Sequence, residues 1–265
     1  MSAVDLFGLA IPATFLVMLG IEALFPARRF PAIRLWRLKG IAFLLVAGIL
    51  AGTLPLLIPE GWLAQHRLMD LTGLGVIGGA VVGYLAVSLV SYAWHRSAHT
   101  FPVMWRLFHQ IHHSPQRMDM SGANLFHPLE LSVFILIGTL TTTLLLGLDP
   151  VAAALTGTIA QFYAYFQHMN VRTPAWLGYV IQRPEAHCLH HQRDIHAWNY
   201  GDLPIWDILL GTWRNPKDFE GAVGFDAPAT GRFGAMLAFI DVNAPASGPN
   251  SLGRNPGADA QAIRG

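Results

Sequence analysis

The sequence has little charge and almost no cysteine. Only 12% of its 265 residues are Asp, Glu, Lys or Arg, against roughly a quarter in ordinary globular domains. The formal net charge is +1, which argues against nucleic-acid binding because that function needs a basic surface. The single cysteine, Cys188, excludes an internal disulfide and any cysteine-ligated zinc or iron–sulfur site. We expect Cys188 to be a small packing residue.

Apolar residues dominate instead, at 53% of the chain with a mean hydropathy of +0.41. This composition predicts an all-α, multi-pass membrane protein. A helix needs about 20 apolar residues to cross a bilayer, and four runs are predicted to do so: 6–25, 41–58, 71–93 and 131–148. A fifth run, 151–166, is shorter and contains Gln161. It fits either a short or tilted span or half of a hairpin that does not fully cross.

The charges around the first run predict the orientation. Asp5 is the only charged side chain before it, whereas a cleaved signal peptide has positive charge there, so we expect a retained span. Five basic residues follow between Arg28 and Lys39, and the positive-inside rule places this loop in the cytoplasm. If the segment from 131 to 166 crosses and returns, the polar stretches on both sides of it are also cytoplasmic. We therefore expect a cytoplasmic, histidine-rich helical cap on a protein of the cell (inner) membrane.

Histidines form the most specific pattern in the chain. The spacing HxxHH occurs twice, beginning at His109 and at His187, and His95 and His99 form a further pair upstream. At the chain's own histidine frequency one such triple is expected roughly 0.02 times, so chance does not explain two copies. If each box is helical, its imidazoles share one face and form a single cluster. Imidazole suits iron, zinc, copper and nickel, so the boxes predict a metal site.

Other histidine chemistries fit less well. A zinc hydrolase of the HExxH type has Glu after the first histidine, but Arg96 occupies that position here. A metal transporter would place its ligands near the bilayer midplane, and a bis-histidine haem protein would bury a pair between helices. The boxes lie at or beyond the span ends. A membrane metal-binding protein or transporter without oxygenase activity remains the alternative function.

Glycines in the third apolar run formally match the dinucleotide-binding pattern GxGxxG, beginning at Gly73. No strand–turn–helix context surrounds them, so we do not expect a nucleotide site. Gly75, Gly79 and Gly83 instead form a stripe of small residues at helical spacing. This pattern favours close packing against another membrane helix.

An ordered series of motifs covers most of 91–213 and resembles the fatty acid hydroxylase and sterol desaturase superfamily, integral-membrane enzymes with a histidine-rich di-iron centre. The matched motifs are the three boxes, the pair His127-Pro128 followed by Glu130, the stretch 166–170 around His168, the stretch 199–201, and the stretch 206–212.

The resemblance implies an oxygenase that uses two iron ions and dioxygen to hydroxylate or desaturate a C–H bond of a lipid. Reduction of dioxygen also needs electrons, and the sequence has no cysteine cluster or credible nucleotide fold, so we expect a separate donor, namely a reductase, ferredoxin or cytochrome. The metal ligands implied are His95, His99, His109, His112, His113, His187, His190 and His191, with His168 as a further ligand.

Ligating imidazoles need partners for their second ring nitrogen. The candidates are His127, Glu130, Asn170, Asp194, Asn199 and Asp207. Asn199 and Asp207 fit equally well as residues that only form a turn and cap a helix. His196 lies five residues after the last box and off its ligand face, so we expect a structural role.

We divide the chain into N-terminal membrane helices (1–93), a hydroxylase-like di-iron domain (94–220) that includes a transmembrane hairpin (131–166), and a C-terminal region (221–265). Small and polar residues from 241 onward predict a disordered tail.

Overall fold

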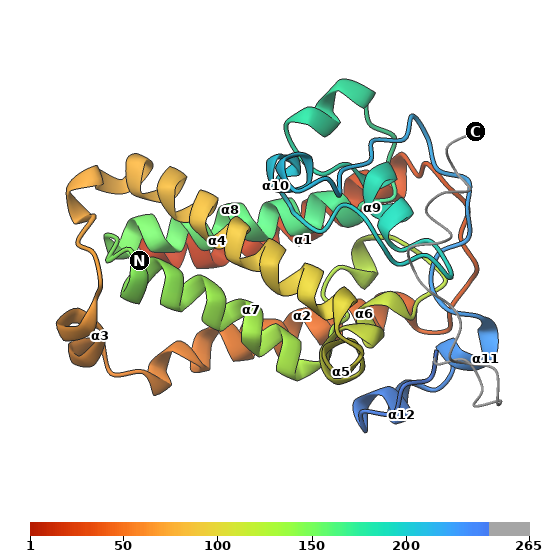
Figure 1. Ribbon diagram of the computed structural model, residues 1–265, viewed down its shortest axis with the longest axis horizontal. Coiled ribbons are helices and arrows are strands. Elements are labelled where there is room, and N and C mark those ends of the chain that lie inside the picture. The colour runs from red at the N-terminus through yellow and green to blue at the C-terminus, as the bar shows by residue number, and fades with distance from the viewer. Residues whose placement is uncertain (244–265) are drawn as a thin grey trace.

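The computed structural model describes residues 1–243, which are helical and contain no strand beyond one isolated bridge between Gln192 and Val223. Five long helices lie side by side (Figure 1). They are α1 (Ala3–Leu24), α2 (Trp36–Thr53), α4 (Gly75–Thr100), α7 (Pro128–Leu140) and α8 (Pro150–His168). Four segments are long and apolar enough to cross a membrane: Ala3–Leu24, Trp36–Leu57, Thr72–Thr100 and Pro128–Leu145. The prediction of an all-α, multi-pass membrane protein is confirmed.

The helix α8 runs the length of the bundle although it is less apolar than the other four. Its 19 residues span about 28 Å at 1.5 Å per residue, close to the thickness of a bilayer core. The predicted glycine stripe lets it approach α4 closely. A Cβ added to Gly79 would lie 2.9 Å from the Cβ of Ala152, and one on Gly83 would lie 2.5 Å from Oγ1 of Thr156. The helices α7 and α8 form a hairpin, in which α7 leads away from the histidine end of the bundle and α8 returns to it.

All the histidine boxes and the basic loop after α1 lie at one end of the bundle. Arg28 in this loop donates from Nη2 to Oδ1 of Asp218 at 3.0 Å and from Nε to the carbonyl of Phe219 at 2.9 Å. The N-terminus and α3 (Glu60–His66) lie at the opposite end (Figure 1). His66 is exposed there and stacks on Trp62.

Short helices form most of the cap, by which we mean the part of the protein at the histidine end of the bundle. Other short helices lie in the loops between the long helices. The α-helices are α5 (Pro102–Met104), α6 (Gln110–His113), α9 (Pro184–His190), α10 (Pro204–Leu209), α11 (Ala227–Thr230) and α12 (Phe233–Leu237). The 3₁₀ turns are η1 (Pro55–Leu57), η2 (Thr72–Leu74), η4 (Met120–Gly122) and η6 (Ala175–Tyr179), and the π turns are η3 (Trp105–His109) and η5 (Thr141–Leu145).

The chain after Gly221 belongs to this cap as far as Asn243. Phe225, Ala229 and Met236 are buried in one cluster with Trp36 and Ile111, which directly precedes His112 in the HxxHH box at His109. The composition of this stretch did not predict that it packs onto the cap, because only a few apolar side chains make the buried contacts. The predicted disordered tail began at 241, but Val242 is buried in this cluster and its N–H donates to Oε1 of Gln110, so the prediction was wrong for 241–243. The rest of the predicted tail lies outside the described residues.

Candidate metal centre

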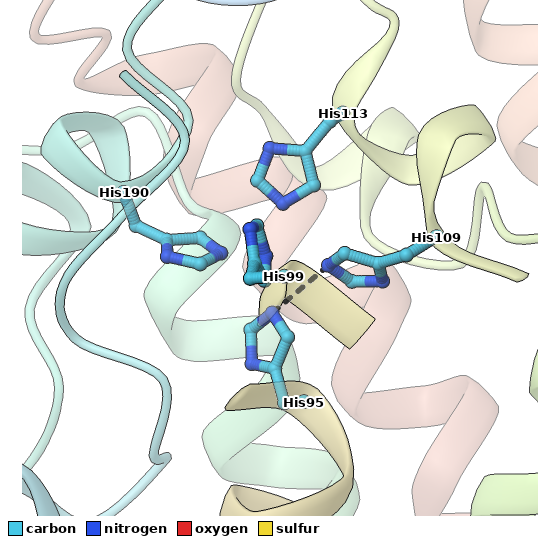
Figure 2. A group of neighbouring side chains, drawn as sticks. All are labelled: His95, His99, His109, His113 and His190. Carbon is cyan, nitrogen blue, oxygen red and sulfur yellow. Dashed lines mark hydrogen bonds between the residues drawn. The ribbon is translucent and has the colours of Figure 1, made fainter. Parts of the chain in front are cut away.

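The nine histidines predicted as ligands fall into two groups, and within each group one ring nitrogen per residue lies within 4.8 Å of the others. The five-histidine group contains His95, His99, His109, His113 and His190 (Figure 2). The four-histidine group contains His112, His168, His187 and His191.

Each HxxHH box contributes to both groups, so the expectation that a box forms a single cluster was wrong. His109 and His113 enter the five-histidine group, whereas His112 enters the other; in the second box, His187 and His191 belong together and His190 is separate. The reason is helical geometry. Residues i and i+4 point in similar directions, but consecutive residues diverge by about 100° and cannot aim at one point.

Main-chain and side-chain acceptors fix the outer nitrogens of the five-histidine group. Nδ1 of His95 donates to the carbonyl of Tyr200 and Nδ1 of His190 to the carbonyl of Trp198, each at 2.7 Å. Nδ1 of His109 donates to Oε1 of Glu130 at 2.7 Å. Because these acceptors hold the Nδ1 protons, the neutral rings present Nε2 as a lone pair.

These lone pairs converge as the ligands of a metal ion do. Nε2 of His95 and Nε2 of His109 are 2.9 Å apart, although both nitrogens act as acceptors in the tautomers just derived. Nε2 of His99, His113 and His190 is buried without a hydrogen-bond partner. Buried polar atoms are normally paired, so this set of nitrogens fits a bound metal ion.

The four-histidine group has the same character with fewer outer contacts. Nδ1 of His168 donates to the carbonyl of Ala164 at 2.6 Å, while its Nε2 lies 3.2 Å from Nε2 of His112 and 3.1 Å from Nε2 of His187. The Nδ1 atoms of His112 and His187 are buried and unpartnered. This group therefore also fits a metal ion, with a less tightly held ligand set.

Burial keeps the cap imidazoles neutral. Desolvation lowers the pKa of His109 to about 3. Desolvation, followed by repulsion between neighbouring imidazolium charges, holds the pKa of the other box histidines after α4 well below the usual range: His112, His113, His187, His190 and His191. Metal binding requires the neutral form, so burial prepares these rings as ligands.

Among the predicted outer partners, Glu130 contacts a box histidine directly and Asp207 acts through the backbone. Glu130 is fully buried in the first turn of α7 and accepts from His109. Asp207 accepts from the backbone N–H of Tyr200 and of Gly201, each at 2.8 Å. It thereby holds the loop whose Tyr200 carbonyl accepts from His95, which agrees with the turn-forming interpretation of Asp207.

Of the other four candidates, three contact backbone rather than an imidazole, and Asp194 makes neither contact within the described residues. Asn199 donates to the carbonyl of Ala186 and accepts from the N–H of Arg214. Asn170 exchanges two hydrogen bonds with the backbone of Arg28. His127 caps α7 by accepting from the N–H of Leu129 at 3.1 Å, and Asp194 is exposed with a φ of 65°.

The segment after the last box folds back over the five-histidine group, which the sequence did not indicate. Nδ1 of His196 lies 3.0 Å from Nδ1 of His113, although His196 is in neither group. Four non-glycine residues in this segment have positive φ, namely Asp194, His196, Trp198 and Asn199. Such strain persists only where the surroundings enforce it. Spacing within the chain could not reveal this contact, because it depends on the path of the loop.

Aromatic rings surround the groups. The Trp105 ring centroid is 5.3 Å from that of His99 and 5.2 Å from that of His113, and Phe126 stacks on His112 with centroids 3.9 Å apart. These rings exclude water from the imidazoles. Cys188 is buried among Met118, Phe219 and Val223, which agrees with a packing role.

Comparison with known proteins identifies the family. Over 164 residues the chain is 34% identical to ornithine lipid hydroxylase OlsE of Rhizobium tropici, a match covering 60% of this chain and 49% of that protein. Over 143 residues it is 29% identical to alkylglycerol monooxygenase of Danio rerio, covering 52% and 31%. The chain thus spans about half and about a third of the lengths of these relatives. No solved structure matches. Residues 80–212, which contain all nine grouped histidines, match the family described as fatty acid hydroxylase, and the chain belongs to that family.

Proposed function

We propose that this chain is a membrane-bound lipid hydroxylase whose two histidine groups each hold one iron ion. The observation that carries the proposal is the presence of two imidazole groups in the cap. Within each group, the Nε2 atoms of neighbouring histidines point at one another. When bound, two irons would supply the activation of dioxygen that oxidation of an unactivated C–H bond requires.

The relatives support a lipid as substrate. One is named a hydroxylase of ornithine lipid and the other a monooxygenase of alkylglycerol. In this chain the groups lie at one end of a bundle of apolar helices, which fits a substrate that resides in the membrane. We therefore propose hydroxylation, rather than desaturation, of a lipid C–H bond.

The residues of the chain orient the ligands and exclude water. The carbonyls of Tyr200 and Trp198 and the carboxylate of Glu130 hold protons on Nδ1 atoms, so that each Nε2 stays free to bind. The rings of Trp105 and Phe126 cover the imidazoles. Within the described residues neither group includes a carboxylate, so bound iron would keep most of its positive charge.

The proposed reaction needs a source of electrons. Hydroxylation consumes one dioxygen, two electrons and two protons, and yields the alcohol and one water. The chain has a single cysteine, and its GxGxxG match lies in η2 and α4 rather than in a strand–turn–helix unit. We propose a separate reductase, ferredoxin or cytochrome as donor, and a cytoplasmic cap because the basic loop lies at that end.

The test is metal analysis of the purified full chain, followed by oxygen uptake with lipid extract and an added electron-transfer system. We expect two irons per chain and lipid-dependent uptake that disappears in a His99→Ala variant. Tight metal binding with no lipid-dependent uptake under any donor would instead support the metal-binding or transport alternative.

A further inference from the structure

An apolar groove runs between the cap ends of α1 and α8, on the outer side of the bundle. Its volume is about 680 Å³, and its walls include Met18, Ile21, Phe25, Phe162 and Phe166. Phe25 and Phe162 are exposed, which is unfavourable in water but suits contact with acyl chains. No residue of either histidine group lines the groove.

A basic pocket of about 430 Å³ adjoins this groove on the cap, and the two cavities share Ala27 and Arg172 as lining residues. Two carboxylates, of Asp218 and Glu220, line the pocket. Its cationic residues are Arg28, Arg29, Arg172 and Arg193. Four guanidinium groups against two carboxylates leave a net positive pocket directly beside an apolar groove.

The positive charge in the basic pocket is not fully satisfied within the described residues. The side chain of Arg28 is only 10% exposed, and its Nη1 is buried without a partner. Arg28 shares Asp218 with Arg172, whose Nη2 lies 3.1 Å from Oδ2 of that residue. The other carboxylate neighbour of Arg28, Glu185 at 3.8 Å, is shared with the buried Arg183. Burying an unpaired guanidinium nitrogen is costly, so an anion in the pocket would be stabilised.

Hydrogen bonds to Asn170 hold the backbone of Arg28, which lines the basic pocket. The N–H of Arg28 donates to Oδ1 of Asn170 at 3.0 Å, and Nδ2 of Asn170 donates back to the carbonyl of Arg28 at 2.8 Å. The backbone N–H of Asn170 in turn donates to buried Glu22 at 2.8 Å. The position of Arg28 is therefore fixed by the fold before any ligand arrives.

We propose that the groove and the basic pocket together bind one anionic lipid, with an acyl chain in the groove and the headgroup anion among the arginines. Basic pockets beside membrane helices are suited to anionic headgroups, and the groove provides the apolar surface that a free anion would not need. The proposed lipid site is separate from the two histidine groups, and its existence does not depend on the proposed hydroxylase activity.

The test measures lipid binding to the purified full chain in mixed micelles by native mass spectrometry. The probes are phosphatidylglycerol, phosphatidylcholine with identical acyl chains, and glycerol phosphate as a headgroup without chains. We expect phosphatidylglycerol to bind preferentially. Arg172→Ala, whose side chain is 72% exposed, should lower its affinity about fivefold, the factor that roughly 1 kcal/mol per surface arginine corresponds to.

Matched variants separate this site from general attraction. Arg37→Ala removes an exposed arginine from the same end of the bundle but outside both cavities, and it should leave binding unchanged. Phe162→Ala should weaken both lipids alike because it removes groove surface. Equal effects of Arg172→Ala and Arg37→Ala would overturn the proposal. So would glycerol phosphate binding as tightly as phosphatidylglycerol, since the groove would then contribute nothing.

Discussion

Glu130 should determine how tightly the five-histidine group binds metal. Its carboxylate accepts from Nδ1 of His109 at 2.7 Å in a fully buried position. A hydrogen bond to a charged group contributes about 1.5–3 kcal/mol, which corresponds to roughly 10- to 100-fold in affinity and matches the effect expected for outer partners of metal ligands. Glu130→Leu should therefore weaken iron binding by this factor, and Glu130→Gln, which keeps an acceptor oxygen, by less.

The assay is chelator competition with iron content measured per folded chain. Glu130→Leu should lose one iron at a chelator concentration that leaves the wild type with two, because the four-histidine group does not contact Glu130. Thermal unfolding of the metal-free protein would separate lost binding from lost folding. Glu60→Gln is the matched control, since Glu60 is exposed at the opposite end of the bundle. Unchanged iron affinity in Glu130→Leu would refute the assignment of His109 as a ligand oriented by this carboxylate.

Four further predictions follow from the same geometry. His168→Ala should abolish iron loading and activity as a substitution in a box does, because Nε2 of His168 lies within 3.2 Å of two other predicted ligand nitrogens. His66→Ala should be neutral, and equal iron content in the two variants would contradict this. His196→Ala should retain measurable activity but bind iron about 10-fold more weakly, through loss of support for a ligand ring; wild-type affinity in chelator competition would count against that role. The metal-free protein should lose stability as pH falls below about 6.5. Burial lowers the pKa of His109 to about 3 and of His196 to about 4, so the unfolded chain takes up protons at a higher pH than the folded protein does. A melting temperature that is flat between pH 7 and pH 5 would be inconsistent with this. A reporter fused after Gly221 should read as cytoplasmic, and an external reading would reverse the orientation.

Local sequence features predicted the helices and the histidines that come together. Apolar run length gave the four candidate spans, and the glycine stripe anticipated the close contact between α4 and α8. The HxxHH spacing singled out its histidines without any knowledge of the fold. These features could be predicted from the sequence because they depend on helix geometry within a few residues.

Features set by long-range packing were not predictable in this way. Whether 151–166 returned to the cap depended on its contacts with α1 and α4, not on its modest hydropathy. Helix geometry divides each HxxHH box between two groups, but which histidines of the other boxes join each group depended on how the boxes pack in the cap. His196 was assigned a structural role from its spacing, yet the loop brings it to His113.

Outer partners were the least predictable, because residue type does not reveal the contact. Glu130 supports His109 as expected, but Asn170 holds the loop after α1, and two ligand rings rely on the backbone carbonyls of Trp198 and Tyr200. A carbonyl leaves no signature in the sequence.

The most direct test of the central claim is to incubate membranes containing the full chain with isotopically labelled dioxygen, a lipid extract and an electron-transfer system, and to analyse the lipids by mass spectrometry. The account predicts a lipid product that carries one labelled oxygen atom and is absent with the His99→Ala variant. A product whose new oxygen comes from water, or equal labelling with that variant, would contradict it.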